Sequence, residues 1–288
     1  MVLHRPRRAL ASGAVGVLHA LALLALAARL GYDVGPAAGP VAFATRVVEL
    51  ALVAAVPAWL ALRYRLLAPL LALCVASAAV AGLELAPPGP TFRDVAELER
   101  LAHPTGVTVV ENGLYVLRYA VSAPVWALGL LGVGALEADA RDRSARLPAA
   151  LDPPAWLSPP VSRRPAARVA AGAGVLHAAV SVWFAVELGV ALAGGSTLLL
   201  YAWGAAGAFV LAAAPVYAYC RGRLVAPLAG LVAFVCWDAA ASLTVTVEDP
   251  HALYFGGWFL PLAVLCALGV VEYALRALAR LDGRAASA

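Results

Sequence analysis

Eight apolar stretches run through this chain, and each spans roughly 20 residues or more. Lipid offers no hydrogen bonds to an open backbone, so stretches of this length and hydropathy form helices that cross the bilayer. The stretches lie near residues 9–30, 42–62, 66–86, 113–136, 168–193, 197–220, 224–247 and 252–275. The sequence therefore predicts an all-α fold, a polytopic transmembrane bundle of about eight helices.

The composition agrees with lipid as the main solvent. Charged residues make up 13% of the chain, against about 25% in a soluble domain, and the mean hydropathy is +0.86. The four cysteines lie in or beside apolar stretches and form no CxxC pair, which argues against a zinc site or a disulfide framework. The net charge of +4 comes from arginines in short loops, so we expect the lipid bilayer as partner and no nucleic acid.

The arginines predict the orientation of the chain. With a cytoplasmic N-terminus, 16 of the 21 arginines fall in the inner loops and tails. The other five are Arg29, Arg46, Arg93, Arg100 and Arg118. The positive-inside rule then predicts a multi-pass protein of the cell membrane with both termini in the cytoplasm.

The second half of the chain repeats the first at an offset of 158 residues. Gly-Val-Leu-His-Ala at 16–20 returns at 174–178, and Arg-Leu-x-Ala-Pro-Leu at 65–70 returns at 223–228. Glu137 matches Glu272 at a shorter offset, because the second half lacks a long outer loop. Each copy has four crossings, so both enter from the same side. We expect two parallel four-helix repeats related by a pseudo-twofold axis along the membrane normal.

This pattern divides the chain into three parts: residues 1–137 as the first repeat, 138–167 as a Pro/Arg-rich cytoplasmic linker, and 168–288 as the second repeat. Within the first repeat, segment 91–102 starts with a Thr-x-x-Asp pair that resembles a helix cap, and apolar residues follow at three-residue spacing. It predicts a short amphipathic helix on the outer membrane surface.

Two histidines, His19 and His177, occupy the same repeat position near the middle of their apolar stretches. Ionisable groups at such depth usually face the bundle interior. If their helices meet at the pseudo-axis, the two imidazoles form a plausible ligand pair for haem or copper. Alternatively, each imidazole hydrogen-bonds to a neighbouring helix and has a structural role.

Two carboxylates, Glu49 and Asp238, lie inside apolar stretches, whereas their repeat counterparts are Gly207 and Val80. A group present in only one copy suggests a function acquired by that half. Proton relay and cation coordination are the usual roles of carboxylates inside a membrane. Pairing with Arg46 or Arg118 is the structural alternative.

One further repeat position carries opposite charges, with Arg29 in the first copy and Glu187 in the second. Matching positions can face each other across a pseudo-twofold axis. We expect an ion pair near the outer boundary, which either gates a pathway or clamps the halves together.

Three classes of function stay open. Transport of a small solute or ion through the interface between the repeats is favoured by analogy with parallel-repeat transporters. A bis-His haem- or metal-binding redox protein is the second class, and a non-catalytic membrane assembly partner is the third. The chain has no HExxH, phosphate-binding GxxxxGK or GxSxG motif, so no enzyme class is indicated.

Overall fold

The computed structural model describes residues 5–37, 39–86, 91–92, 109–110, 115–144, 161–187, 195–243 and 256–285. Its helices are α1 (Arg5–Arg29), α2 (Pro40–Tyr64), α3 (Ala68–Leu85), α5 (Tyr115–Val121), α6 (Ala123–Arg143), α7 (Arg163–Glu187), α8 (Gly195–Gly222), α9 (Val225–Ala241) and α11 (Phe259–Ala285). Two short antiparallel strands, β1 (Thr91–Phe92) and β2 (Val109–Val110), complete the described elements. The predicted all-α membrane bundle is confirmed.

Seven of these helices are long and apolar enough to cross a membrane. The remaining predicted crossing corresponds to α9, which is apolar but shorter, at Val225–Ala241. We call α1 to α6 the first half of the molecule and α7 to α11 the second half.

The fourth predicted crossing is interrupted, which corrects the expectation of one helix over 113–136. The helix is interrupted at Ser122, between α5 and α6. Pro124 has no N–H to donate to the preceding turn, so a continuous helix would lose a hydrogen bond here. Instead the backbone N–H groups of Val125 and Trp126 both donate to the carbonyl of Ser122, at 3.0 and 3.1 Å.

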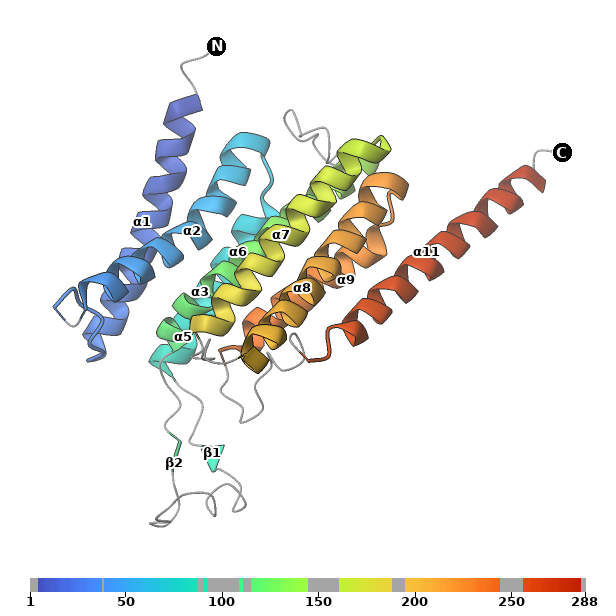
Figure 1. Ribbon diagram of the computed structural model, residues 1–288. Helices are drawn as coiled ribbons and strands as arrows, with labels where there is room; N and C mark the ends of the chain where they lie inside the picture. The colour runs from blue at the N-terminus through green and yellow to red at the C-terminus, as the bar shows by residue number, and fades with distance from the viewer. Residues whose placement is uncertain are drawn as a thin grey trace.

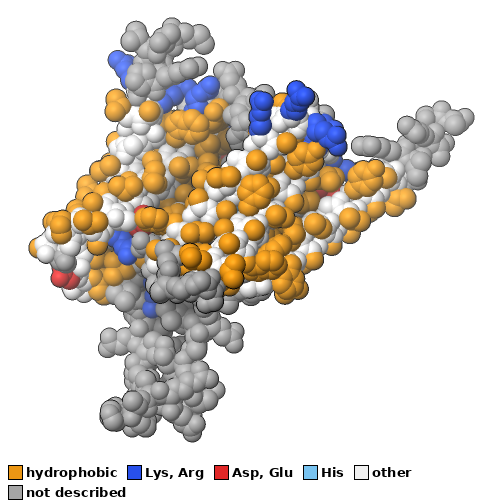
Figure 2. Space-filling model, in the orientation of Figure 1, with side chains coloured by type: hydrophobic (Ala, Val, Ile, Leu, Met, Phe, Trp, Pro, Cys, Tyr) orange, Lys and Arg blue, Asp and Glu red, His pale blue; other side chains and the backbone are white. Residues whose placement is uncertain are grey.

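The two halves run in the same direction. Figure 1 shows α1 and α7 descending from one end of the bundle, and α2 and α8 returning to it. The start of α1 and the end of α11 therefore lie at the same end of the molecule. Most of the arginines visible in Figure 2 also gather at this end, which we call the arginine-rich end.

The apolar core is divided between the halves. Leu50, Val53 and Tyr119 are fully buried in the cluster that α1, α2, α3 and α5 share. Phe184 and Leu211 are buried in a second cluster, to which α6 also contributes. Each half thus has a main buried cluster, and α6 contributes residues to both.

Matching hairpins join α2 to α3 and α8 to α9. The residue after each first helix, Arg65 or Arg223, has a left-handed backbone, with φ of 60° and 53°. The N–H of Arg65 donates to the carbonyl of Ala61 at 3.0 Å, and that of Arg223 to Tyr219 at 2.8 Å. The recurring Arg-Leu segments therefore form the same helix-ending turn.

The halves meet where α6 packs against α9. A Cβ on Gly129 would lie 2.9 Å from Sγ of Cys236, and one on Gly132 would lie 2.4 Å from Cγ2 of Val232. A pseudo-twofold axis would also pair α3 with α11, but α11 packs against α8 and α9 and forms the opposite edge of the described bundle (Figure 1). The contact between the halves is thus not reciprocal, in contrast to the expected pseudo-twofold arrangement.

Two smaller expectations also change. Thr91 and Phe92, expected at the start of an amphipathic helix, form β1, while 93–102 lies outside the described residues. The predicted linker 138–167 is helical at both ends, because α6 continues to Arg143 and α7 begins at Arg163.

Candidate functional site

A groove of about 600 Å³ lies between α2 of the first half and α7 of the second. Its lining consists of Ala44, Thr45, Val48, Glu49, Leu52, Pro124, Ala179, Val180 and Trp183. Val48, Leu52 and Trp183 are all more than a third exposed, so the groove opens on the apolar flank of the bundle. Glu49 is the one ionisable side chain in this lining.

Glu49 is held by an arginine one turn earlier on the same helix. Oε2 of Glu49 lies 3.3 Å from a guanidinium nitrogen of Arg46, which donates a hydrogen bond to it. The Glu49 side chain is 6% exposed and that of Arg46 is 26% exposed. A carboxylate this deep needs such a partner. The pairing with Arg46, which the sequence analysis gave as the structural alternative for Glu49, is therefore present.

The same position in the second half is closed. Gly207 stands where the first half has Glu49, and a Cβ there would lie 2.2 Å from the ring of Trp258. The indole thus occupies the space that a side chain at position 207 would need. The sequence showed that the carboxylate is not doubled, and the structure supplies the steric reason.

Asp238 lies apart from this groove. It is on α9 and is 2% exposed, the most buried carboxylate of the described chain. Its neighbours Val235 and Ala239 belong to the core of the second half. The structure does not bring Asp238 into the lining that holds Glu49.

Glu84 has a structural role. One carboxylate oxygen accepts from the hydroxyl of Tyr32 at 2.6 Å, and the other accepts from the backbone N–H of Val116 at 2.7 Å. The carboxylate thereby satisfies a free N–H in the first turn of α5.

The two histidines lie in different helix pairs. His177 on α7 is buried, and its Nδ1 lies 2.7 Å from the carbonyl of Ala208 on α8, so Nδ1–H is the donor. His19 on α1 is half-buried and packs edge-on against Tyr119 of α5, with ring centroids 6.1 Å apart. Among the described residues, no group of three or more His, Cys, Asp or Glu side chains can hold a metal ion.

The oppositely charged repeat position falls at two helix ends. Arg29 is the last residue of α1, and its side chain is exposed. Glu187 is the last residue of α7, and its side chain lies outside the described part of the structure. Their ion pair stays a prediction.

Two carboxylates that the sequence analysis did not single out, Asp139 and Asp142 of α6, link the halves at the arginine-rich end. The hydroxyl of Tyr219 on α8 donates to Oδ1 of Asp139 at 3.2 Å, and Arg143 lies 2.7 Å from Oδ2. Asp142 forms an ion pair with Arg223. The only feature of the sequence that could have indicated these contacts is the high density of charged residues in this segment. That density is also typical of an ordinary cytoplasmic loop.

A second pair of carboxylates caps the start of a neighbouring helix in each half, α3 in the first and α9 in the second. Glu137 accepts from the N–H groups of Leu67 and Ala68 at 3.1 and 2.7 Å, and Glu272 accepts from that of Ala226 at 2.7 Å. Each glutamate also pairs with the arginine four residues later on its own helix. The Glu-x-x-x-Arg spacing in both halves was the available signal.

No family model, characterised protein or solved structure matches this chain.

Proposed function

We propose that this chain is a multi-pass protein of the cell membrane that moves a small ion or solute along the interface between its halves, with Glu49 in the path. The observation that carries the proposal is the position of the Arg46–Glu49 pair in the wall of the groove between α2 and α7. A desolvated carboxylate at a boundary between two helical bodies is a usual element of ion and proton pathways.

The partner of Glu49 also supports transport. The Arg46 side chain is about four times more exposed than that of Glu49, so the basic member of the pair lies nearer the surface and the acidic member is buried. A cation or proton that reaches the carboxylate competes with the guanidinium for it. The ion pair then acts as the gate, and the permeating ion replaces Arg46 at Glu49.

The duplicated contacts support two parallel repeats. Gly16 and Gly174 each lie against the backbone carbonyl of the next helix, at Ala51 and Phe209, and these two residues are also 158 apart. The matching turns at Arg65 and Arg223 add to this. We place the arginine-rich end, and both termini with it, in the cytoplasm.

The haem- or metal-binding alternative has less support. His177 uses Nδ1 to bind a backbone carbonyl, and His19 lies in the other half against Tyr119. Helix packing accounts for both contacts. Asp238 and the Arg29–Glu187 pair remain candidate elements of the pathway.

Purified protein in liposomes tests the proposal. Vesicles loaded with a pH-sensitive dye, or with Na⁺- or K⁺-sensitive dyes, report flux after a membrane potential is imposed. We expect flux of one of these cations, and we expect Glu49→Gln to reduce it at least tenfold. Asp33→Asn is the matched control, because it removes one negative charge at an exposed residue after α1 that does not line the groove.

Two results would contradict the proposal. Flux of Glu49→Gln within twofold of the parent would remove Glu49 from the pathway. Absence of flux of all three cations in vesicles that hold correctly folded protein would remove cation transport altogether.

A further inference from the structure

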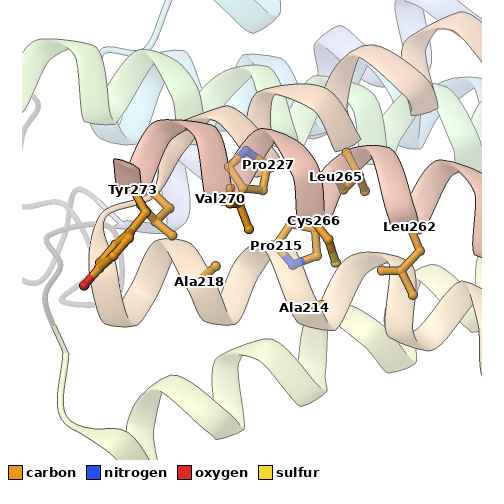
Figure 3. Close-up of a pocket in the computed structure, with 11 residues that line it drawn as sticks. Ala214, Pro215, Ala218, Pro227, Leu262, Leu265, Cys266, Val270 and Tyr273 are labelled. Carbon is orange, nitrogen blue, oxygen red and sulfur yellow. The ribbon is translucent and has the colours of Figure 1, made fainter. Parts of the chain in front are cut away.

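A second groove lies between α8 and α11, over α9, and has a volume of about 390 Å³. Figure 3 shows Ala214, Pro215 and Ala218 of α8 on one side and Leu262 and Cys266 of α11 on the other. The lining is almost entirely apolar and also includes Pro227 of α9. The volume falls within the range of sites that hold small organic ligands.

In the first half, the equivalent seam between α2 and α6 is closed. Its residues Leu60, Leu66 and Ala138 form a buried cluster, with Val56, Leu131 and Ala135 packed against it. The counterparts of Val56 and Leu60, 158 positions on, are Ala214 and Ala218 of the open groove. The smaller side chains on α8 leave this space, so the sequence itself encodes the groove.

The groove continues into a basic mouth. An adjoining cavity of about 390 Å³ shares Ala218, Leu224 and Tyr273 with the apolar groove and adds Arg221 and Arg276. Both arginines lie at the arginine-rich end of the bundle.

Each guanidinium is positioned by backbone carbonyls. Arg221 donates to the carbonyl of Val161 at 2.9 Å, and Arg276 donates to that of Arg223 at 2.8 Å while it pairs with Glu272. A guanidinium has five N–H donors, so these contacts leave donors for a further acceptor.

We propose that this site binds an anionic phospholipid, with one acyl chain in the groove between α8 and α11 and the phosphate at Arg221 and Arg276. An apolar slot that ends at paired arginines matches an amphiphile with a negative head group, and phosphate is an acceptor that arginine binds well. Basic pockets between transmembrane helices on the cytoplasmic side recognise such head groups. This inference is independent of the proposed transport.

Lipid titration of the delipidated full chain, followed by native mass spectrometry, tests the proposal. The probes are palmitoyl-oleoyl phosphatidylglycerol and palmitoyl-oleoyl phosphatidylcholine, which share acyl chains and differ in head-group charge. We expect the phosphatidylglycerol to bind at least tenfold more tightly. Arg221→Gln should reduce this preference to threefold or less, while the double variant Arg163→Gln/Arg164→Gln, at exposed arginines of α7, should preserve it.

A second pair of variants tests the groove itself. Ala214→Val/Ala218→Leu introduces the first-half residues, and we expect it to reduce the binding of both lipids tenfold without loss of thermal stability. Ala202→Val/Ala206→Leu adds the same volume on exposed positions of α8 and should bind as the parent does. Equal affinity of the parent for the two lipids, or unchanged phosphatidylglycerol binding in the filled groove, would overturn the proposal.

Discussion

At the scale of single residues, the left-handed arginines at the ends of α2 and α8 give a matched pair for experiment. Arg65 is exposed and Arg223 pairs with Asp142, yet both have a backbone conformation that disfavours residues with a Cβ. We expect Arg65→Gly to stabilise the protein by about 1 kcal/mol, because glycine adopts positive φ without this cost. Thermal unfolding in detergent should show a higher midpoint.

Arg223→Gly is the comparison, since it relieves the same strain and removes the ion pair to Asp142. We expect no gain in its unfolding midpoint, or a decrease. Equal stabilisation in both variants would mean that the Arg223 side chain contributes nothing to the contact between the halves.

Part of the candidate site could be predicted residue by residue. Arg46 and Glu49 are one helical turn apart, so their ion pair follows from spacing and from the cost of a lone charge in lipid. The groove around them could not be predicted, because the opposite wall comes from Trp183 on α7. Nothing local to either helix encodes that contact.

At the scale of helices, substitutions at two glycines distinguish the effect of close helix packing on stability from the effect of helix propensity. A Cβ on Gly132 of α6 would lie 2.4 Å from Val232 of α9, whereas a Cβ on Gly82 of α3 would meet nothing within 4 Å. We expect Gly132→Ala to destabilise the protein by about 1–3 kcal/mol through overpacking. Gly82→Ala should stabilise it by up to about 1 kcal/mol through helix propensity.

Thermal unfolding of the two alanine variants in the same detergent measures this difference. If Gly132→Ala were as stable as Gly82→Ala, close approach at Gly132 could not be what joins α6 to α9.

The helices themselves were the most predictable elements, because an apolar stretch in lipid has no alternative to helix. Proline effects were less predictable. Pro57 and Pro215 remain inside continuous helices, whereas Pro124 follows a break at Ser122. All three prolines lie in apolar stretches, and nothing local to them in the sequence distinguishes the one that follows a break.

At the scale of the whole molecule, the orientation can be measured directly. We expect a fluorescent protein fused to the C-terminus to fold and fluoresce in the cytoplasm of a bacterial host. Alkaline phosphatase inserted at Val34, after α1, should be active, because this enzyme needs the oxidising exterior to form its disulfides. Active phosphatase at the C-terminus with an inactive insertion at Val34 would reverse the topology.

The way the halves meet was the least predictable feature of the fold. The repeat in sequence indicates that two similar bodies exist, and it leaves open which faces touch, because nearly every face is apolar. Gly129 and Gly132 select the face of α6 that packs on α9. At the offset that relates Glu137 to Glu272, the corresponding residues of α11 are Val264 and Ala267, so the glycine face is not repeated there.

The indole of Trp258 over Gly207 also has a historical consequence. If the halves descend from one duplicated ancestor, the second half could not acquire a carboxylate of its own at this position once the ring of Trp258 covered Gly207. A glutamate cannot be placed at position 207 while the ring is there, and the ring fits only above a glycine. A second carboxylate of this kind would therefore require changes at positions 207 and 258 together.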